Sequence, residues 1–171
     1  MLDLLARTTK IEKIKIAEFP LTLRDFVVKV DRTTRSRCAY PKGMKPVHPE
    51  LSLTGPPEYN IKTLKVETYK RKSLREDVRI IYNQLRQNNV LESCLGLTDL
   101  LAIEKKGSFA FYKAFGNKKL YVYGLKSLCE DSEHQLRVPV LTSSCYGGLF
   151  LFWERFDFSQ KDISIAYFSK P

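Results

Sequence analysis

The chain has 171 residues, of which 43% are hydrophobic and 12% aromatic, which suits one folded domain and excludes a disordered chain. No uninterrupted apolar run is long enough to span a membrane. The net charge of +10 is uneven, because residues 1–72 hold 16 Lys/Arg against 8 Asp/Glu, and this asymmetry favours an anionic partner such as a nucleic acid or a membrane surface.

The N-terminal part predicts two short strands and a long loop. Residues 13–16 alternate like a half-buried strand, and residues 26–30 are rich in β-branched side chains. Five of the eight prolines then fall within residues 41–57. Because proline cannot donate a backbone hydrogen bond, this stretch is predicted to be a loop and neither central sheet nor helix interior.

Two helices are predicted after a strand at residues 61–69. Ser73 and Glu76 form a capping box, and Asn88-Asn89 ends the helix. A second helix is expected near residues 98–106, with Gly107 following its last residue. The buried stripe of the first helix is predicted to consist of Leu74, Val78, Ile81 and Leu85.

The remainder of the chain reads as antiparallel sheet. Residues 109–115 and 120–123 are predicted to form a hairpin around a Gly116-Asn117 turn. Further strands are expected at residues 136–141, 149–158 and 163–167, with Phe150, Phe152, Phe156 and Phe158 on one face. The pattern predicts an α+β fold, in which two main helices pack on one side of an antiparallel sheet in a single domain. Within it, residues 1–60 form a basic N-terminal region with a proline-rich loop, and residues 61–171 form the α+β core.

No arrangement of residues predicts catalysis. The four cysteines have no short metal-binding spacing, so we expect free thiols, no metal site and no cofactor. Glu104-Lys105-Lys106 resembles part of a nuclease site, but no partner carboxylate is placed by the sequence. We therefore expect a protein that is not an enzyme. The first residues lack the apolar core of a signal peptide, which predicts an intracellular, non-secreted protein.

A basic cluster is the strongest candidate binding site. It combines the loop-rich segment from Lys29 to Lys45 with a second run that ends at Lys72. Charges that support no predicted core are available to phosphates or to an anionic membrane. The candidate residues are Lys29, Arg32, Arg35, Arg37, Lys42, Lys45, Lys70, Arg71 and Lys72.

The sequence Pro-Pro-Glu-Tyr has two interpretations. Pro56 and Pro57 favour polyproline II, the conformation that WW domains bind, and Tyr59 would fill a second pocket. Alternatively, the motif is a turn that leads into the strand predicted at Ile61. The docking role requires an exposed Tyr59, whereas the structural role requires a packed one.

The order of these features resembles the matrix proteins of rhabdoviruses. The resemblance covers residues 55 to about 158 and rests on Pro-Pro-x-Tyr, IKTLKVETY, the helix pair SLREDVRIIYNQL and TDLLAIEKK, and the later segments FAFYKAFGNKKLYVYGL and CYGGLFLFWERFDF. It is a similarity of pattern, without a long identical stretch, and short plant-infecting members of the family suit the length best.

The resemblance implies a viral structural protein that self-associates beneath a membrane, condenses the nucleocapsid and promotes assembly and budding. The implied partners are further copies of the chain, an anionic membrane surface, viral ribonucleoprotein or RNA, and a WW-domain ubiquitin ligase. The implied location is the virion and host cytoplasm, peripheral to membrane. Two alternatives remain open, namely a small basic nucleic-acid-binding domain and, less favoured, a nuclease.

Overall fold

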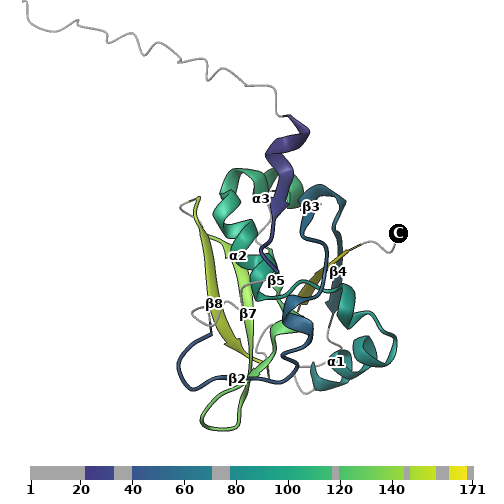
Figure 1. Ribbon diagram of the computed structural model, residues 1–171, viewed down its shortest axis with the longest axis vertical. Coiled ribbons are helices and arrows are strands. Elements are labelled where there is room, and N and C mark those ends of the chain that lie inside the picture. Colours follow the sequence, from purple (N-terminus) through teal and green to yellow (C-terminus); the bar gives the residue numbers. More distant parts are fainter. Residues whose placement is uncertain are drawn as a thin grey trace, which may run out of the picture.

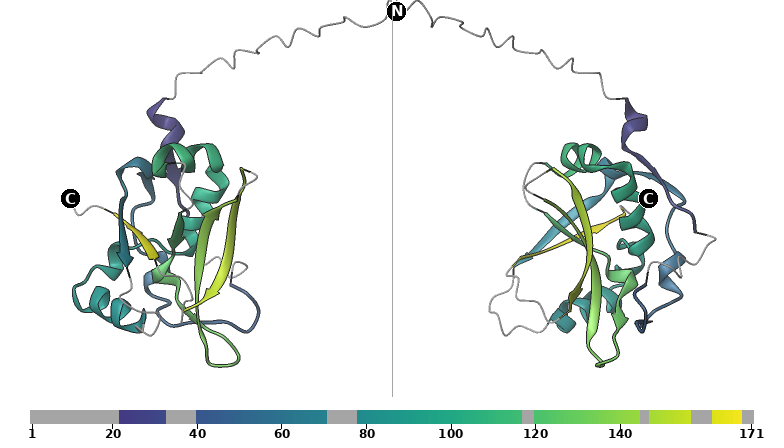
Figure 2. Two further views of the ribbon diagram at one scale, coloured as in Figure 1. Left: turned by 180° about the vertical axis from the view of Figure 1, so that it is seen from behind. Right: turned by 90° about the vertical axis from the view of Figure 1, so that its left-hand side faces the viewer.

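The structure is a computed structural model that describes residues 22–32, 40–70, 78–116, 120–144, 147–156 and 162–168. Its main sheet has seven strands in the order β2-β6-β7-β5-β9-β4, and β8 pairs with the other edge of β7. A separate two-stranded sheet consists of β1 and β3. Figures 1 and 2 show these sheets with α2 and α3 at one end of the molecule. No helix among the described residues is long and apolar enough to cross a membrane.

The elements follow one another along the chain with short connections. The 3₁₀ turns are η1 (Leu23–Phe26), η2 (Leu51–Leu53), η3 (Ile61–Thr63), η4 (Leu91–Ser93) and η5 (Leu125–Ser127). The helices are α1 (Val78–Gln87), α2 (Leu97–Lys106) and α3 (Ser108–Phe115). The strands are β1 (Val27–Lys29), β2 (Lys45–Pro46), β3 (Glu58–Asn60), β4 (Lys65–Lys70), β5 (Tyr121–Tyr123), β6 (Cys129–Glu130), β7 (Leu136–Ser143), β8 (Leu149–Arg155) and β9 (Asp162–Tyr167).

The predicted α+β architecture in a single compact domain is confirmed, with two differences in the sheet and its helices. The sheet is mixed, because β5 and β9 run parallel where Val122 pairs with Ser164. The helices also divide between two core clusters. Tyr82 of α1 packs in one cluster with Val140, whereas Leu100 of α2 packs in the other with Leu141. Since neighbouring residues of a strand point to opposite faces, the helices lie on both sides of the sheet.

Helix α3 replaces the predicted strand at residues 109–115. The alternation of phenylalanine with small residues suggested a strand, but helical spacing also joins Phe111 to Phe115, whose ring centroids lie 4.9 Å apart. Ala110 and Phe111 are buried on the same side. Gly107 and Gly116 flank the helix with φ of +100° and +82°, a backbone conformation that glycine adopts without strain.

The segment before Ile61 contributes to the core. Phe26, Val28 and Tyr59 are buried in the cluster that contains α2 and α3. Within the predicted loop at residues 41–57, β2 pairs with β6, and η2 adds a 3₁₀ turn. The predicted strand at residues 61–69 begins instead with η3, and β4 follows from Lys65. The strand predicted at residues 13–16 lies outside the described residues.

Strand β8 confirms part of the predicted aromatic face. Phe150 and Phe152 pair with Thr142 and Val140 of β7 and are 55% and 37% exposed. Phe156 lies beyond the end of the strand and is buried in the cluster that contains Val140, the partner of Phe152 in β7. Phe158 is not among the described residues. The outer end of this sheet face therefore presents two aromatic rings to solvent.

Candidate anion-binding groove

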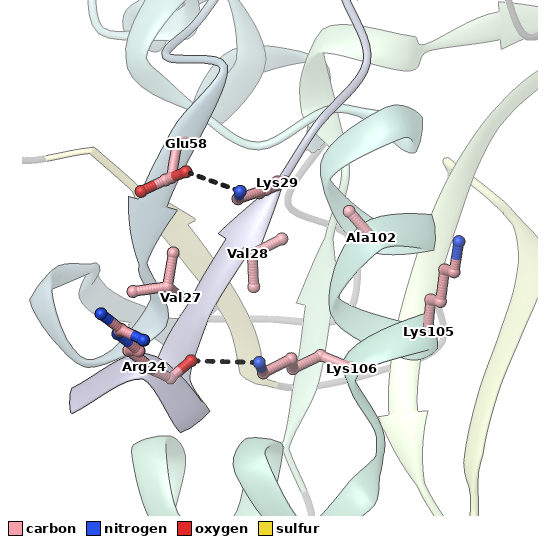
Figure 3. Close-up of a pocket in the computed structure, with 8 residues that line it drawn as sticks. All are labelled: Arg24, Val27, Val28, Lys29, Glu58, Ala102, Lys105 and Lys106. Carbon is pink, nitrogen blue, oxygen red and sulfur yellow. Dashed lines mark hydrogen bonds and ion pairs between the residues drawn. The ribbon is translucent and has the colours of Figure 1, made fainter. Parts of the chain in front are cut away.

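A groove between β1 and α2 gathers four basic side chains. It has a volume of about 590 Å³, and its apolar lining residues are Val27, Val28 and Ala102. In Figure 3, Val28 and Ala102 lie between the strand and the helix, Val27 lies on the other side of the strand, and Lys105 extends from the side of α2 that faces away from it. The charged lining residues are Arg24, Lys29, Lys105, Lys106 and Glu58. Four cations against one carboxylate give the lining a formal charge of +3.

Two of the four cations, Lys29 and Lys106, interact with other residues of the groove. Lys29 Nζ lies 3.7 Å from Glu58 Oε2, and both side chains are more than half exposed, so water screens this pair and it contributes little stability. Lys106 Nζ donates to the backbone carbonyl of Arg24 at 3.1 Å. Among the described residues, neither the guanidinium of Arg24 nor the ammonium of Lys105 has an ion-pair partner. These two charges are available to an external anion.

The local sequence explains why the groove is basic. Lys105 and Lys106 occupy the last turn of α2, where cations are stabilised by the unpaired carbonyls of the helix end. Arg24 and Lys29 lie in η1 and β1, which pack beside α3 and α2 respectively. Sequence reasoning assigned Lys29 to a binding site but missed Arg24, Lys105 and Lys106. The sequence carries no clear signal for them, because Arg24 precedes Asp25 and Lys105 follows Glu104. The two elements that carry them become neighbours only after folding.

Arg32 was predicted to bind an anionic partner, and this assignment is wrong. Its side chain is only 11% exposed and lies 2.5 Å from Asp99 Oδ1. It also donates to the carbonyl of Pro56 at 3.0 Å and to the hydroxyl of Thr98 at 3.1 Å. Arg32 therefore holds the proline-containing segment against the start of α2 and is not a free surface charge.

Lys126 completes this buried cluster. Its side chain is fully buried, lies 3.8 Å from Asp99 Oδ2, and donates to the carbonyl of Thr54 at 2.6 Å. Burial lowers the pKa of Lys126, and the charge of Asp99 opposes that shift. Asp99 in turn accepts a hydrogen bond from the backbone N–H of Gly96, which caps α2. These contacts are structural, because breaking a buried ion pair leaves an uncompensated charge.

The other predicted basic residues do not form one surface with the groove. Lys42 and Lys45 are exposed, but Lys45 lies in β2 beside β6, whereas Lys29 lies in β1 beside α2. Figure 1 shows β2 at the opposite end of the domain from α3. Lys70 ends β4, but its side chain is outside the description. Arg35, Arg37, Arg71 and Lys72 also fall outside the described residues.

Pro-Pro-Glu-Tyr is part of the fold. Tyr59 is 9% exposed, pairs with Val28 across β1 and β3, and packs its ring edge-on against Phe168 at 4.9 Å. The WW-domain interpretation of Pro56, Pro57 and Tyr59 required an accessible tyrosine. That interpretation is therefore corrected in favour of the turn that leads into a strand.

The described residues contain no group of three or more side chains that could hold a metal ion. Cys94 and Cys129 are buried free thiols, while Cys38 and Cys145 lie outside the description. No protein-family model, curated protein or solved structure matches this chain. The case for function therefore rests on the residues and their geometry.

Proposed function

We propose that this chain is a non-enzymatic, matrix-type assembly protein that attaches to anionic surfaces through the basic groove and associates with further copies of itself. The observation that carries the proposal is the pair of uncommitted cations, Arg24 and Lys105, beside Lys29 and Lys106 in one groove. The pattern resemblance to rhabdovirus matrix proteins supports the same function. The proposed location is peripheral to the membrane, in the virion and the host cytoplasm.

The expected attachment is reversible and sensitive to salt. Each Lys or Arg close to an anionic lipid surface contributes about 1 kcal/mol. The formal charge of +3 in the groove lining would therefore supply about 3 kcal/mol at low ionic strength. Because exposed charges are screened over about 8 Å at physiological salt, attachment should weaken as salt is added. Viral ribonucleoprotein, whose phosphates have the same charge, is the second proposed anionic partner.

Strand β8 supports the self-association part of the proposal. No described strand pairs with its outer edge. Ser144 N–H donates to Gly148 and Phe156 N–H donates to Leu136, so the even-numbered residues of β8 form the hydrogen-bonded pairs with β7. In an antiparallel ladder the residues between them direct their backbone groups the other way. The backbone groups of Leu151 and Trp153 therefore point to the open edge. A long apolar edge strand is a template for pairing with another chain. The exposed rings of Phe150 and Phe152 add apolar surface to that edge.

Vesicle co-sedimentation with a parallel RNA titration tests the proposal. A groove variant combines Arg24→Gln, Lys29→Gln and Lys105→Gln, all at exposed positions. A matched variant combines Lys42→Gln, Lys45→Gln and Lys65→Gln, which removes the same charge from exposed positions outside the groove lining. We expect the groove variant to lose about tenfold or more in affinity for phosphatidylserine vesicles, and the matched variant to lose clearly less.

Two outcomes would contradict the proposal. A parent protein that binds neither anionic vesicles nor RNA at low salt has no anionic partner of this kind. Equal losses in the two variants would mean that overall charge acts and the groove does not. Tight binding of RNA without any binding of vesicles would favour the alternative, a small nucleic-acid-binding domain. Such a domain would use exposed aromatic rings to stack on bases, but every tyrosine with a described side chain is buried or half-buried.

A further inference from the structure

Phe109 stands in solvent at the junction of α2 and α3. It is 57% exposed, the largest exposed fraction among the large hydrophobic side chains of the described residues. Its neighbours Ala110 and Phe111 are buried in the core, so α3 is anchored without Phe109. An exposed phenylalanine on a well-packed helix adds nothing to the core, and its ring is available to an apolar environment outside the protein.

Lysines precede and follow Phe109 along the chain. Lys113 follows one helical turn later, and its Nζ lies 5.9 Å from the centroid of the Phe109 ring. Lys105 and Lys106 precede the junction in the last turn of α2. Between Glu104 and Glu130 the sequence has six lysines and no acidic residue. With Glu104 next to Lys105, the junction thus combines an apolar ring with three lysines, Lys105, Lys106 and Lys113, against one carboxylate.

We propose that the α2–α3 junction is the part of the protein that enters an anionic bilayer, with Phe109 inserted at the level of the lipid headgroups and upper acyl chains. This inference rests on the proposed attachment to anionic surfaces and names the side chains that perform it. Lys105, Lys106 and Lys113 remain with the headgroup phosphates, because a lysine stem lies along apolar surface while its ammonium stays in the polar layer. Figures 1 and 2 show η1, which carries Arg24, at this same end of the molecule.

A bilayer suits this surface better than RNA. Single-stranded nucleic acid is held by several aromatic rings along a basic track, on which successive bases stack. Phe109 is the one large exposed hydrophobic side chain on α3, and the exposed Phe150 and Phe152 lie on β8. A single apolar ring within a group of lysines matches the interface of an anionic membrane, where one side chain can be buried while its neighbours stay hydrated.

The first experiment compares Phe109→Ser with Ile80→Ser in co-sedimentation with vesicles of phosphatidylcholine and phosphatidylserine. Ile80 is a suitable control because it is 51% exposed and lies on α1, away from the junction. We expect Phe109→Ser to weaken binding about tenfold or more, as for the loss of one buried phenylalanine, with Ile80→Ser within about twofold of the parent. Thermal melts followed by circular dichroism check that both variants are folded.

A second experiment reads insertion directly and does not depend on that comparison. Trp153→Phe removes the sole tryptophan, and Phe109→Trp then reports the position of the junction. We expect lipids brominated on their acyl chains to quench this fluorescence. Unchanged binding by a folded Phe109→Ser variant, or the absence of quenching in bound Phe109→Trp, would overturn the inference.

The outcomes separate this inference from the broader proposal. If the parent protein binds no vesicles, the proposed function itself fails. If the parent binds but Phe109 is neither needed nor quenched, attachment is purely electrostatic and only the insertion step is wrong. If Phe109→Ser loses RNA binding while vesicle binding is unchanged, the ring stacks on bases and the bilayer is not its partner.

Discussion

Tyr59 illustrates how much of a side chain's role depends on its partners. Its ring is packed against Phe168, and burial raises the pKa of its phenol above the ordinary value, with the charge of Asp99 adding to the shift. Its hydroxyl is buried and has no hydrogen-bond partner among the described residues. The ring therefore contributes apolar packing, while the hydroxyl contributes little or is a cost.

Tyr59→Ala is expected to lower the free energy of unfolding by about 2–4 kcal/mol, because it leaves a cavity between β3 and Phe168. Urea denaturation followed by circular dichroism measures this change. Tyr59→Phe is the matched control, which keeps the ring and removes only the unpaired hydroxyl, so its stability should equal or exceed that of the parent. A Tyr59→Ala variant as stable as the parent would show that the ring is not packed in solution.

The turn before Tyr59 depends on glycine. Gly55 has φ of +117°, and a Cβ at this position would lie 2.9 Å from Arg32 Nη2 and 3.2 Å from Lys126 Nζ. The two buried cations thus approach the backbone closely and donate to the carbonyls on either side of Gly55, those of Pro56 and Thr54. Any side chain at residue 55 would displace these donors and add backbone strain.

Sequence reasoning recognised both possible roles of Tyr59 but could not choose between them, because exposure is decided by Val28 and Phe168, which are far away in the chain. The prediction that Arg32 binds an external anion was wrong for the same reason. Lys29, Arg35 and Arg37 make the surrounding segment basic on balance, whereas the partner of Arg32, Asp99, is 67 positions away. A local charge pattern cannot distinguish an arginine in solvent from one that a distant carboxylate will bury.

Helix α1 buries the apolar stripe that the sequence predicted, at least at Leu85. Leu85 is 5% exposed and packs in the cluster with Tyr82 and Val140. Leu85→Ala should therefore cost about 2–5 kcal/mol of unfolding free energy, measured by urea denaturation. Ile80→Ala on the same helix, at a position 51% exposed, should change stability by less than about 0.5 kcal/mol. Equal effects at the two positions would mean that α1 packs differently.

Strand β8 is expected to drive association between copies. Phe150→Ser and Phe152→Ser together remove the two exposed rings of the strand and should shift the equilibrium in sedimentation velocity towards monomer across a concentration series. Ile80→Ser, which removes an exposed apolar side chain on α1, should leave the distribution unchanged. Identical distributions for the β8 variant and the parent would place the self-association surface elsewhere.

The elements that could be predicted are those whose sequence fits only one hydrophobic periodicity, that of a helix or that of a strand. The helix expected near residues 98–106 is confirmed as α2, and the strands expected at residues 136–141 and 163–167 correspond to β7 and β9. Helix α3 was missed because FAFYKAF satisfies both a strand's alternation and a helix's spacing of four. Its burial between η1, η3 and α2 decides the outcome, and those contacts join parts of the chain that no local window contains.

For the whole molecule, buried thiols and a buried phenol limit stability in alkali. Burial raises the pKa of Cys94 and of Cys129 from 9.0 to about 12, and that of Tyr82 from 10.0 to about 12. The unfolded chain releases these protons near the ordinary values, while the folded chain retains them. Their contribution to stability is thus complete below pH 9 and is lost as pH rises towards 12. Lys126 acts oppositely, because its pKa is lowered.

We expect the free energy of unfolding, measured by urea titration at a series of pH values, to decline steadily from about pH 9. The double variant Cys94→Ala, Cys129→Ala should begin from a lower stability, since it loses buried atoms, but should decline less steeply with pH. The comparison of slopes isolates the titration of the thiols from the packing defect. Equal slopes in parent and variant would show that the thiols do not contribute.

The position of β9 governs when the protein can fold during its synthesis. In the order of the sheet, β9 lies between β4 and β5. The carbonyl of Ala166 in β9 accepts from Leu95 N–H, and the N–H of Phe168, just beyond the strand, donates to the carbonyl of Ser93. Until residues 162–167 leave the ribosome, β4 has no partner in the sheet and the β5–β8 segment has an unprotected inner edge. The nascent chain must therefore carry one partial sheet with an open edge and the unpaired strand β4, a state that is prone to aggregation. The main sheet is therefore completed in one step, when β9 pairs with β4 and β5.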